Sequence, residues 1–179
     1  MYKPLLRLKG TLAMQNNRFT YSSVERKELW RKAIKWPIYS IAIMPILLAA
    51  GWEIGHGHGI RVDQFIGFLF ASICLLLWEN LTNDIFDADT GIDESNKPHS
   101  IVFLVGKRGI LYLFSSIILF LGLLTIFLLA LRSQLSVFIL ILICCTIGYI
   151  YQGPPFRLGY KGLGEPLCWI TFGPLATCA

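Results

Sequence analysis

Charged residues are scarce in this sequence: they make up 15% of its 179 residues, whereas apolar residues make up 55% and the mean hydropathy is +0.60. Soluble domains usually contain about 25% charged residues, and disordered chains combine low hydrophobicity with high charge. The shortage of charge therefore excludes a disordered protein and argues against a water-soluble domain. We expect the chain to lie in a lipid bilayer.

Cysteine and histidine are also few, and they are not arranged as metal ligands or as a disulfide framework. The three histidines have no cysteine at ligand spacing, and no CxxC motif occurs. The five cysteines all lie in apolar stretches: Cys74, Cys144, Cys145, Cys168 and Cys178. They are typical of small core residues, so the sequence indicates no disulfide and no thiolate metal site.

Long apolar windows account for most of the chain. About 20 apolar helical residues cross ~30 Å of hydrocarbon. Four complete windows of this kind occur, at 33–54, 65–86, 109–131 and 135–151. A fifth begins near residue 166 and is still apolar at residue 179. We therefore predict an all-α integral-membrane helical bundle with four complete transmembrane helices and the start of a fifth, and we expect the sequence to be part of a longer protein.

The distribution of basic residues predicts the orientation. Fourteen of the sixteen Lys and Arg residues lie in the N-terminal segment, the 87–108 loop or the 152–165 loop, and only Arg61 and Arg132 lie on the other side. By the positive-inside rule, the N-terminus and both loops face the cytoplasm. The basic residues flank apolar spans and are not interleaved with aromatics, so nucleic acid is not an expected partner. Tyr149, Tyr151 and Tyr160 are typical of an interfacial aromatic belt.

Two regions follow from this pattern. Residues 1–32 form a basic cytoplasmic segment, and residues 33–179 form the N-terminal part of a membrane domain.

Acidic residues gather at the end of the second span. Six of the eleven fall between positions 79 and 94: Glu79, Asp84, Asp87, Asp89, Asp93 and Glu94. The spacing of Asn80, Asp84 and Asp87, four and then three, places these side chains on one helical face. Carboxylate and amide oxygens suit Mg²⁺ that is shared with the oxygens of a phosphate group. Cations follow in both cytoplasmic loops: Lys97, His99, Lys107, Arg108, Arg157 and Lys161. This combination is typical of a diphosphate site.

Two other interpretations of the acidic cluster remain open. Acidic loops at a membrane surface are often simply solvated. Acidic residues inside a bundle can also relay cations in an ion-coupled transporter, although here they lie at a helix end.

Three sequence blocks resemble a known family. NDIFDADTGID followed by NKPHS resembles the first aspartate-rich motif of the UbiA-type membrane prenyltransferases. The stretches KWPIYSIAIMP, YQGPPFRLGYKGLGEP and FGPLAT are similar to the cyanobacterial and plastid branch of that family. The resemblance runs from residue 35 to residue 179. It implies a bundle of nine transmembrane helices with two aspartate-rich motifs facing a central cavity, of which about the first half is present here.

The resemblance also implies roles for individual residues. The expected Mg²⁺ ligands are Asn83, Asp84, Asp87 and Asp93, although Asp93 lies farther from Asp87 than the common family pattern has it. The expected catalytic residues are Asp84, Asp87, Lys97 and Arg157. The expected substrate-binding residues are Asn80, Asn83, Asp93, Tyr151 and Lys161.

The implied reaction transfers a prenyl (phytyl) group from phytyl diphosphate to 1,4-dihydroxy-2-naphthoate. The acceptor loses its carboxyl group, on the way to phylloquinone or menaquinone, and Mg²⁺ is the expected cofactor. The expected location is a cyanobacterial plasma or thylakoid membrane. A truncated, inactive member of the family is the alternative that the sequence leaves open.

Overall fold

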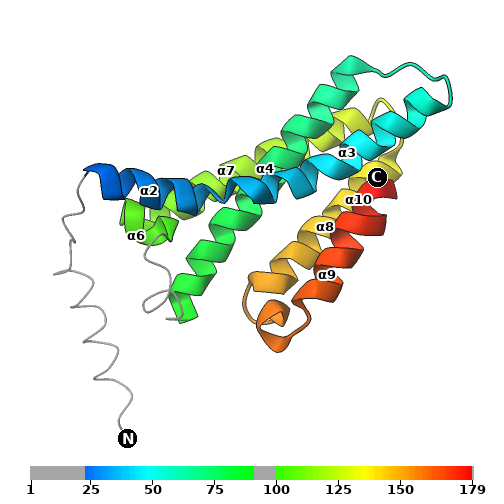
Figure 1. Ribbon diagram of the computed structural model, residues 1–179. Coiled ribbons are helices and arrows are strands. Elements are labelled where there is room, and N and C mark those ends of the chain that lie inside the picture. The colour runs from blue at the N-terminus through cyan, green and yellow to red at the C-terminus, as the bar shows by residue number, and fades with distance from the viewer. Residues whose placement is uncertain (1–22, 91–99, 179) are drawn as a thin grey trace, which may run out of the picture.

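The computed structural model of this chain describes residues 23–90 and 100–178, and every element within them is helical (Figure 1). In chain order the elements are α2 (Ser23–Ile34), α3 (Trp36–Gly55), α4 (Val62–Thr90), α6 (Ile101–Val105), α7 (Arg108–Ala130), α8 (Leu135–Gln152), the 3-10 helix η1 (Leu158–Lys161), α9 (Gly164–Ile170), the π-helical segment η2 (Thr171–Leu175) and α10 (Ala176–Cys178). The predicted all-α fold is confirmed.

Within residues 23–90 and 100–178, four helices are long and apolar enough to cross a membrane, as predicted. They cover Lys27–Gly55, Val62–Thr90, Arg108–Ala130 and Leu135–Gln152. The third and fourth agree with the predicted windows to within one residue at each end. The first continues back through α2, with a change of direction at Lys35, whose φ of 50° is left-handed. A proline in the first turn of α3 is compatible with a helix start, because the first N–H groups need no intrahelical acceptor.

The second span is longer than its apolar window. The window ends at residue 86, but α4 continues for another turn to Thr90. Hydropathy falls at this point, whereas backbone hydrogen bonding does not depend on hydropathy. The polar motif is therefore helical as far as Thr90.

The fifth apolar segment is helical too. It begins at Gly164, two residues before the predicted start, and α9, η2 and α10 follow one another to Cys178. The segment packs alongside α8 and reaches α3 (Figure 1).

Helix α4 is the centre of the bundle. It packs against α3, α7 and α8, most extensively against α7. The buried apolar core contains Cys74, Trp78, Leu81, Ile85 and Phe86 from α4, with Leu111 and Ile118 from α7. Large apolar side chains on the outer face of α7 are exposed instead, among them Leu113, Phe120 and Leu128. Apolar residues on both faces are expected for a helix that packs on protein with one face and contacts lipid with the other.

Close approach of α7 to α4 depends on Gly122. A Cβ at this position would lie 3.0 Å from Leu75 Cδ2 and 3.2 Å from Cys74 Cβ. We expect Gly122→Leu to lower the apparent midpoint of thermal unfolding in detergent by roughly 3–10 °C, because overpacking of a core contact costs about 1–3 kcal/mol. Gly51→Leu is the matched control, since nothing lies within 4 Å of a Cβ there. Equal midpoints for the two variants would contradict the close α4–α7 contact.

Candidate functional site

The last three turns of α4 carry two buried carboxylates. Asp84 is 2% exposed and Asp87 is 3% exposed, and both belong to the predicted motif. An ionised carboxylate removed from water is costly unless it is paired and hydrogen-bonded. Each of these side chains therefore needs partners from other parts of the chain, and those partners define the site.

Asp84 joins two distant segments. Its Oδ1 lies 3.3 Å from Lys35 Nζ, and its Oδ2 accepts a hydrogen bond of 3.0 Å from the backbone N–H of Ile101. Lys35 also donates to Asn80 Oδ1 over 2.7 Å. The left-handed backbone at Lys35 ends α2 and starts α3 next to α4, so one ammonium group contacts two members of the predicted polar face.

Asp87 is held from the opposite loop. Tyr160, in η1, donates its phenolic hydrogen to Asp87 Oδ1. Thr90 donates to the Asp87 carbonyl over 2.7 Å and closes the last turn of α4. The loop after α8 is therefore folded back on the aspartate motif.

Arg108 and Gln152 fix the neighbouring helices to the same end of α4. Arg108, at the start of α7, forms an ion pair with Asp89 and donates to the Ile85 carbonyl over 3.0 Å. Gln152, at the end of α8, donates to Thr82 Oγ1 over 2.6 Å. The start of α3, the end of α4, the start of α7 and the end of α8 therefore meet at one end of the bundle, as the charge pattern predicts.

The other predicted site residues are placed as follows. Asn83 is partly buried on α4, one turn from Asp87. Tyr151 is partly buried at the end of α8, and a Cβ at Gly159 or Gly164 would lie 3.0 Å from its ring. Arg157 has a left-handed backbone (φ 46°) immediately before η1.

Lys161 is exposed within η1. The predicted residues Asp93 and Lys97 lie outside the described residues.

Sequence reasoning missed three contacts of this site. It interpreted Lys35 as a topology charge and Tyr160 as part of an aromatic belt, and it gave Gln152 no role. A lysine immediately before Trp-Pro at the base of a span was the available signal for Lys35. No comparable signal exists for Tyr160, because its contact with Asp87 joins residues 73 positions apart.

The donor set fits a magnesium ion that is shared with a phosphate ligand. Within residues 23–90 and 100–178, no group of three or more His, Cys, Asp or Glu side chains is placed to hold a metal alone. Asn83, Asp84 and Asp87 nevertheless supply hard oxygen atoms along adjacent turns of one helix. Mg²⁺ often takes one or two carboxylates and completes its octahedron with water and substrate phosphates.

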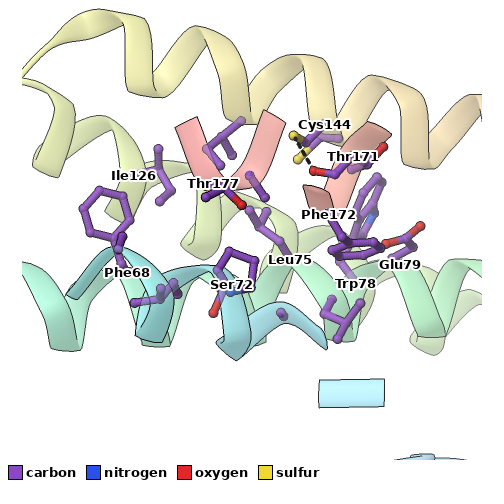
Figure 2. Close-up of a pocket in the computed structure, with 18 residues that line it drawn as sticks. Phe68, Ser72, Leu75, Trp78, Glu79, Ile126, Cys144, Thr171, Phe172 and Thr177 are labelled. Atoms are coloured by element: carbon purple, nitrogen blue, oxygen red, sulfur yellow. Dashed lines mark hydrogen bonds between the residues drawn. The ribbon is translucent and has the colours of Figure 1, made fainter. Parts of the chain in front are cut away.

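An apolar cavity of about 220 Å³ lies deeper in the bundle, between α3, α4, α7, α8 and the C-terminal segment. Figure 2 shows Glu79, Trp78 and Phe172 at one end of it, with Phe68 and Ile126 at the other. Helix α4 therefore carries the polar oxygen atoms near its end and also lines the apolar cavity.

Comparison with known proteins assigns this combination to a family. The model of the UbiA prenyltransferase family matches residues 42–179. A curated protein of Synechocystis sp., 2-carboxy-1,4-naphthoquinone phytyltransferase, is 46% identical over 154 residues, which are 86% of this chain and 50% of that protein. The chloroplastic protein of the same name from Arabidopsis thaliana is 40% identical over 154 residues, 86% of this chain and 40% of that protein.

The chain thus spans half or less of the length of the curated relatives it matches. No solved structure matches it significantly. The family match does not favour the ion-coupled transporter that the sequence left open.

Proposed function

Since this chain belongs to the UbiA prenyltransferase family, we propose that the protein containing it transfers a phytyl group from phytyl diphosphate to 1,4-dihydroxy-2-naphthoate. The observation that carries the proposal is the pair of buried carboxylates at the end of α4, next to an apolar cavity. The names of the two curated relatives support phytyl as the transferred group and a carboxylated naphthoquinone skeleton as the acceptor. Phylloquinone or menaquinone biosynthesis is the corresponding role.

The predicted site residues take defined roles in this proposal. Mg²⁺ would be held by Asn83, Asp84 and Asp87, with Asp93 as a further ligand. When bound, the metal stabilises the negative charge that develops on the leaving diphosphate. Lys97 and Arg157 act as cationic contacts to the same group. The substrate-binding set consists of Asn80, Asn83, Asp93, Tyr151 and Lys161.

The chemistry requires the apolar cavity as much as the polar cluster. The allylic C–O bond breaks, and its electron pair leaves with the diphosphate. The ring carbon that carries the carboxyl group then forms the new C–C bond, and the carboxyl group leaves as CO₂. Trp78, Leu75 and Phe172 line the cavity and exclude water, which would otherwise capture the allylic cation.

The membrane arrangement follows from the same proposal. Residues 33–179 belong to the membrane domain, and residues 1–32 precede it as a basic segment on the cytoplasmic side. The cluster at the end of α4 then faces the cytoplasm, from which a water-soluble diphosphate group can reach it. A cyanobacterial plasma or thylakoid membrane is the proposed location.

Metal removal tests this function directly. Membranes that contain the longest reading frame including this chain are incubated with phytyl diphosphate and 1,4-dihydroxy-2-naphthoate, and the prenylated product is quantified by chromatography. We expect EDTA to reduce product formation by about 1,000-fold, because a Lewis acid contributes several kcal/mol to transition-state stabilisation. Excess Mg²⁺ should restore it. Full activity in EDTA would contradict the metal role, and no product with Mg²⁺ would contradict the substrate assignment.

A further inference from the structure

Glu79 is an acidic residue that the proposed metal site does not use. It lies on α4 and lines the apolar cavity together with Trp78 and Phe172 (Figure 2). Its carboxylate packs against the bare backbone of α8, since a Cβ on Gly148 would lie 3.2 Å from Glu79 Oε1. A Cβ at position 148 would require this carboxylate to shift by a few tenths of an ångström.

The carboxylate of Glu79 has no protein partner among the described residues. Neither a hydrogen bond nor an ion pair to it occurs in the described part of the chain; only its backbone carbonyl accepts a bond, from Thr82. Thr171, on the opposite wall, also has a buried hydroxyl oxygen with no hydrogen-bond partner there. An ionisable side chain within a membrane-spanning segment is expensive and usually marks a functional site. Two polar side chains that have no partner in the described part of the chain thus line one predominantly apolar cavity.

The position of Glu79 along α4 is close to the level expected for the reacting atoms. It precedes Asn83 by four residues, which is about 6 Å along a helix with a rise of 1.5 Å per residue. A donor whose diphosphate lies at the Asn83–Asp87 turn therefore places the first carbons of its chain near the level of Glu79. The chain itself is a hydrocarbon and cannot donate a hydrogen bond to a carboxylate. The aromatic acceptor can, because it carries hydroxyl groups.

We propose that the cavity binds the aromatic acceptor and that Glu79 accepts a hydrogen bond from its 4-hydroxyl group. This inference rests on the proposed function and specifies how the acceptor is oriented. The 2-carboxylate of the acceptor is repelled by Glu79 and points toward the end of the bundle where Lys35 and Arg108 lie. The reacting carbon then faces the donor, and the hydroxyl group remote from the carboxylate faces Glu79. Thr171 supplies a second polar contact.

The test measures acceptor binding in the absence of donor and metal. The protein encoded by the longest reading frame that includes this chain is purified and studied by equilibrium dialysis in oxygen-free detergent buffer. Two probes are compared: 1,4-dihydroxy-2-naphthoate and 1-hydroxy-2-naphthoate, which lacks the 4-hydroxyl group. For Glu79→Gln we expect the Kd of the dihydroxy probe to rise about 10- to 100-fold, the range for a hydrogen bond to a charged group. The Kd of the monohydroxy probe should not rise, because this probe has no 4-hydroxyl group to donate to Glu79.

Two further variants separate binding from cavity structure. Thr171→Val keeps the side-chain shape and removes a hydroxyl group that has no partner within the described residues. If Thr171 had only a structural role, acceptor affinity would not change. We expect instead that the Kd of the dihydroxy probe rises about threefold to tenfold. Ser72→Ala is the matched control in the same cavity. Its hydroxyl group already donates to the Leu69 carbonyl over 2.9 Å, so we expect unchanged binding.

The outcomes separate the inference from the function on which it rests. A Glu79→Gln variant that weakens both probes equally overturns the proposed hydrogen bond, because the loss is then one of cavity shape. Unchanged binding of both probes in the Glu79 and Thr171 variants overturns the acceptor site while leaving phytyl transfer intact. If the unmodified protein binds neither probe, the acceptor assignment of the proposed function fails as well. A loss confined to the dihydroxy probe supports the inference.

Discussion

Replacing Asp87 by asparagine is expected to reduce phytyl transfer by about 1,000-fold while leaving the protein folded in the membrane. The asparagine side chain has the same shape and could still accept the hydrogen bond that Tyr160 donates to Asp87 Oδ1. The negative charge needed to hold Mg²⁺ is lost, however. Asp87 is the more diagnostic of the two buried aspartates, because Asp84→Asn would also remove the negative charge that pairs with Lys35. Product formation and detergent thermal stability are measured on the same preparation.

Asp63→Asn is the matched control on the same helix. Asp63 lies in the first turn of α4, at the opposite end of the bundle, and its side chain is 59% exposed. It lies 3.9 Å from both Arg61 and Arg132, which makes it an exposed ion pair of small energetic value. We expect its activity to stay within about twofold of the unmodified protein. Activity in Asp87→Asn as high as in Asp63→Asn would show that Asp87 is not a metal ligand.

The span pattern could be predicted because it depends on local composition. A window of about 20 apolar residues is sufficient to identify a membrane helix, and the ends of α7 and α8 follow from their flanking turns. The shared face of Asn80 and Asp84 could be predicted for a similar reason, since helical periodicity is local. In the structure both side chains do contact the same ammonium group.

The partners of that face could not be predicted in the same way. Lys35 lies 49 residues from Asp84, and Tyr160 lies 73 residues from Asp87. Such contacts depend on how helices pack, and no local pattern encodes them. Glu79 illustrates the same limit: in sequence it belongs to the acidic cluster, whereas in the structure it lines the apolar cavity.

Lys35→Met is expected to destabilise the bundle, because it removes the cation that faces Asp84. Breaking a buried ion pair by removing one partner costs about 3–5 kcal/mol, and the cost should be lower here, about 2–4 kcal/mol, since Lys35 is 27% exposed. This corresponds to a fall of roughly 5–15 °C in the apparent unfolding midpoint in detergent. Methionine keeps a long unbranched side chain, and the left-handed backbone at position 35 is equally unfavourable for methionine and for lysine. Lys32→Met, at an exposed position on α2, should leave the midpoint unchanged.

The double variant Lys35→Met with Asp84→Asn separates stability from catalysis. If the loss in Lys35→Met comes from the uncompensated charge of Asp84, then neutralising Asp84 should restore most of the unfolding midpoint. Phytyl transfer should be lost in the double variant, because Asp84 is also a proposed metal ligand. A double variant that stays as unstable as Lys35→Met would mean that Lys35 acts through packing at the α2–α3 junction. Undiminished phytyl transfer in a stable double variant would instead show that Asp84 serves only to hold Lys35, and the metal site would then have to be formed without it.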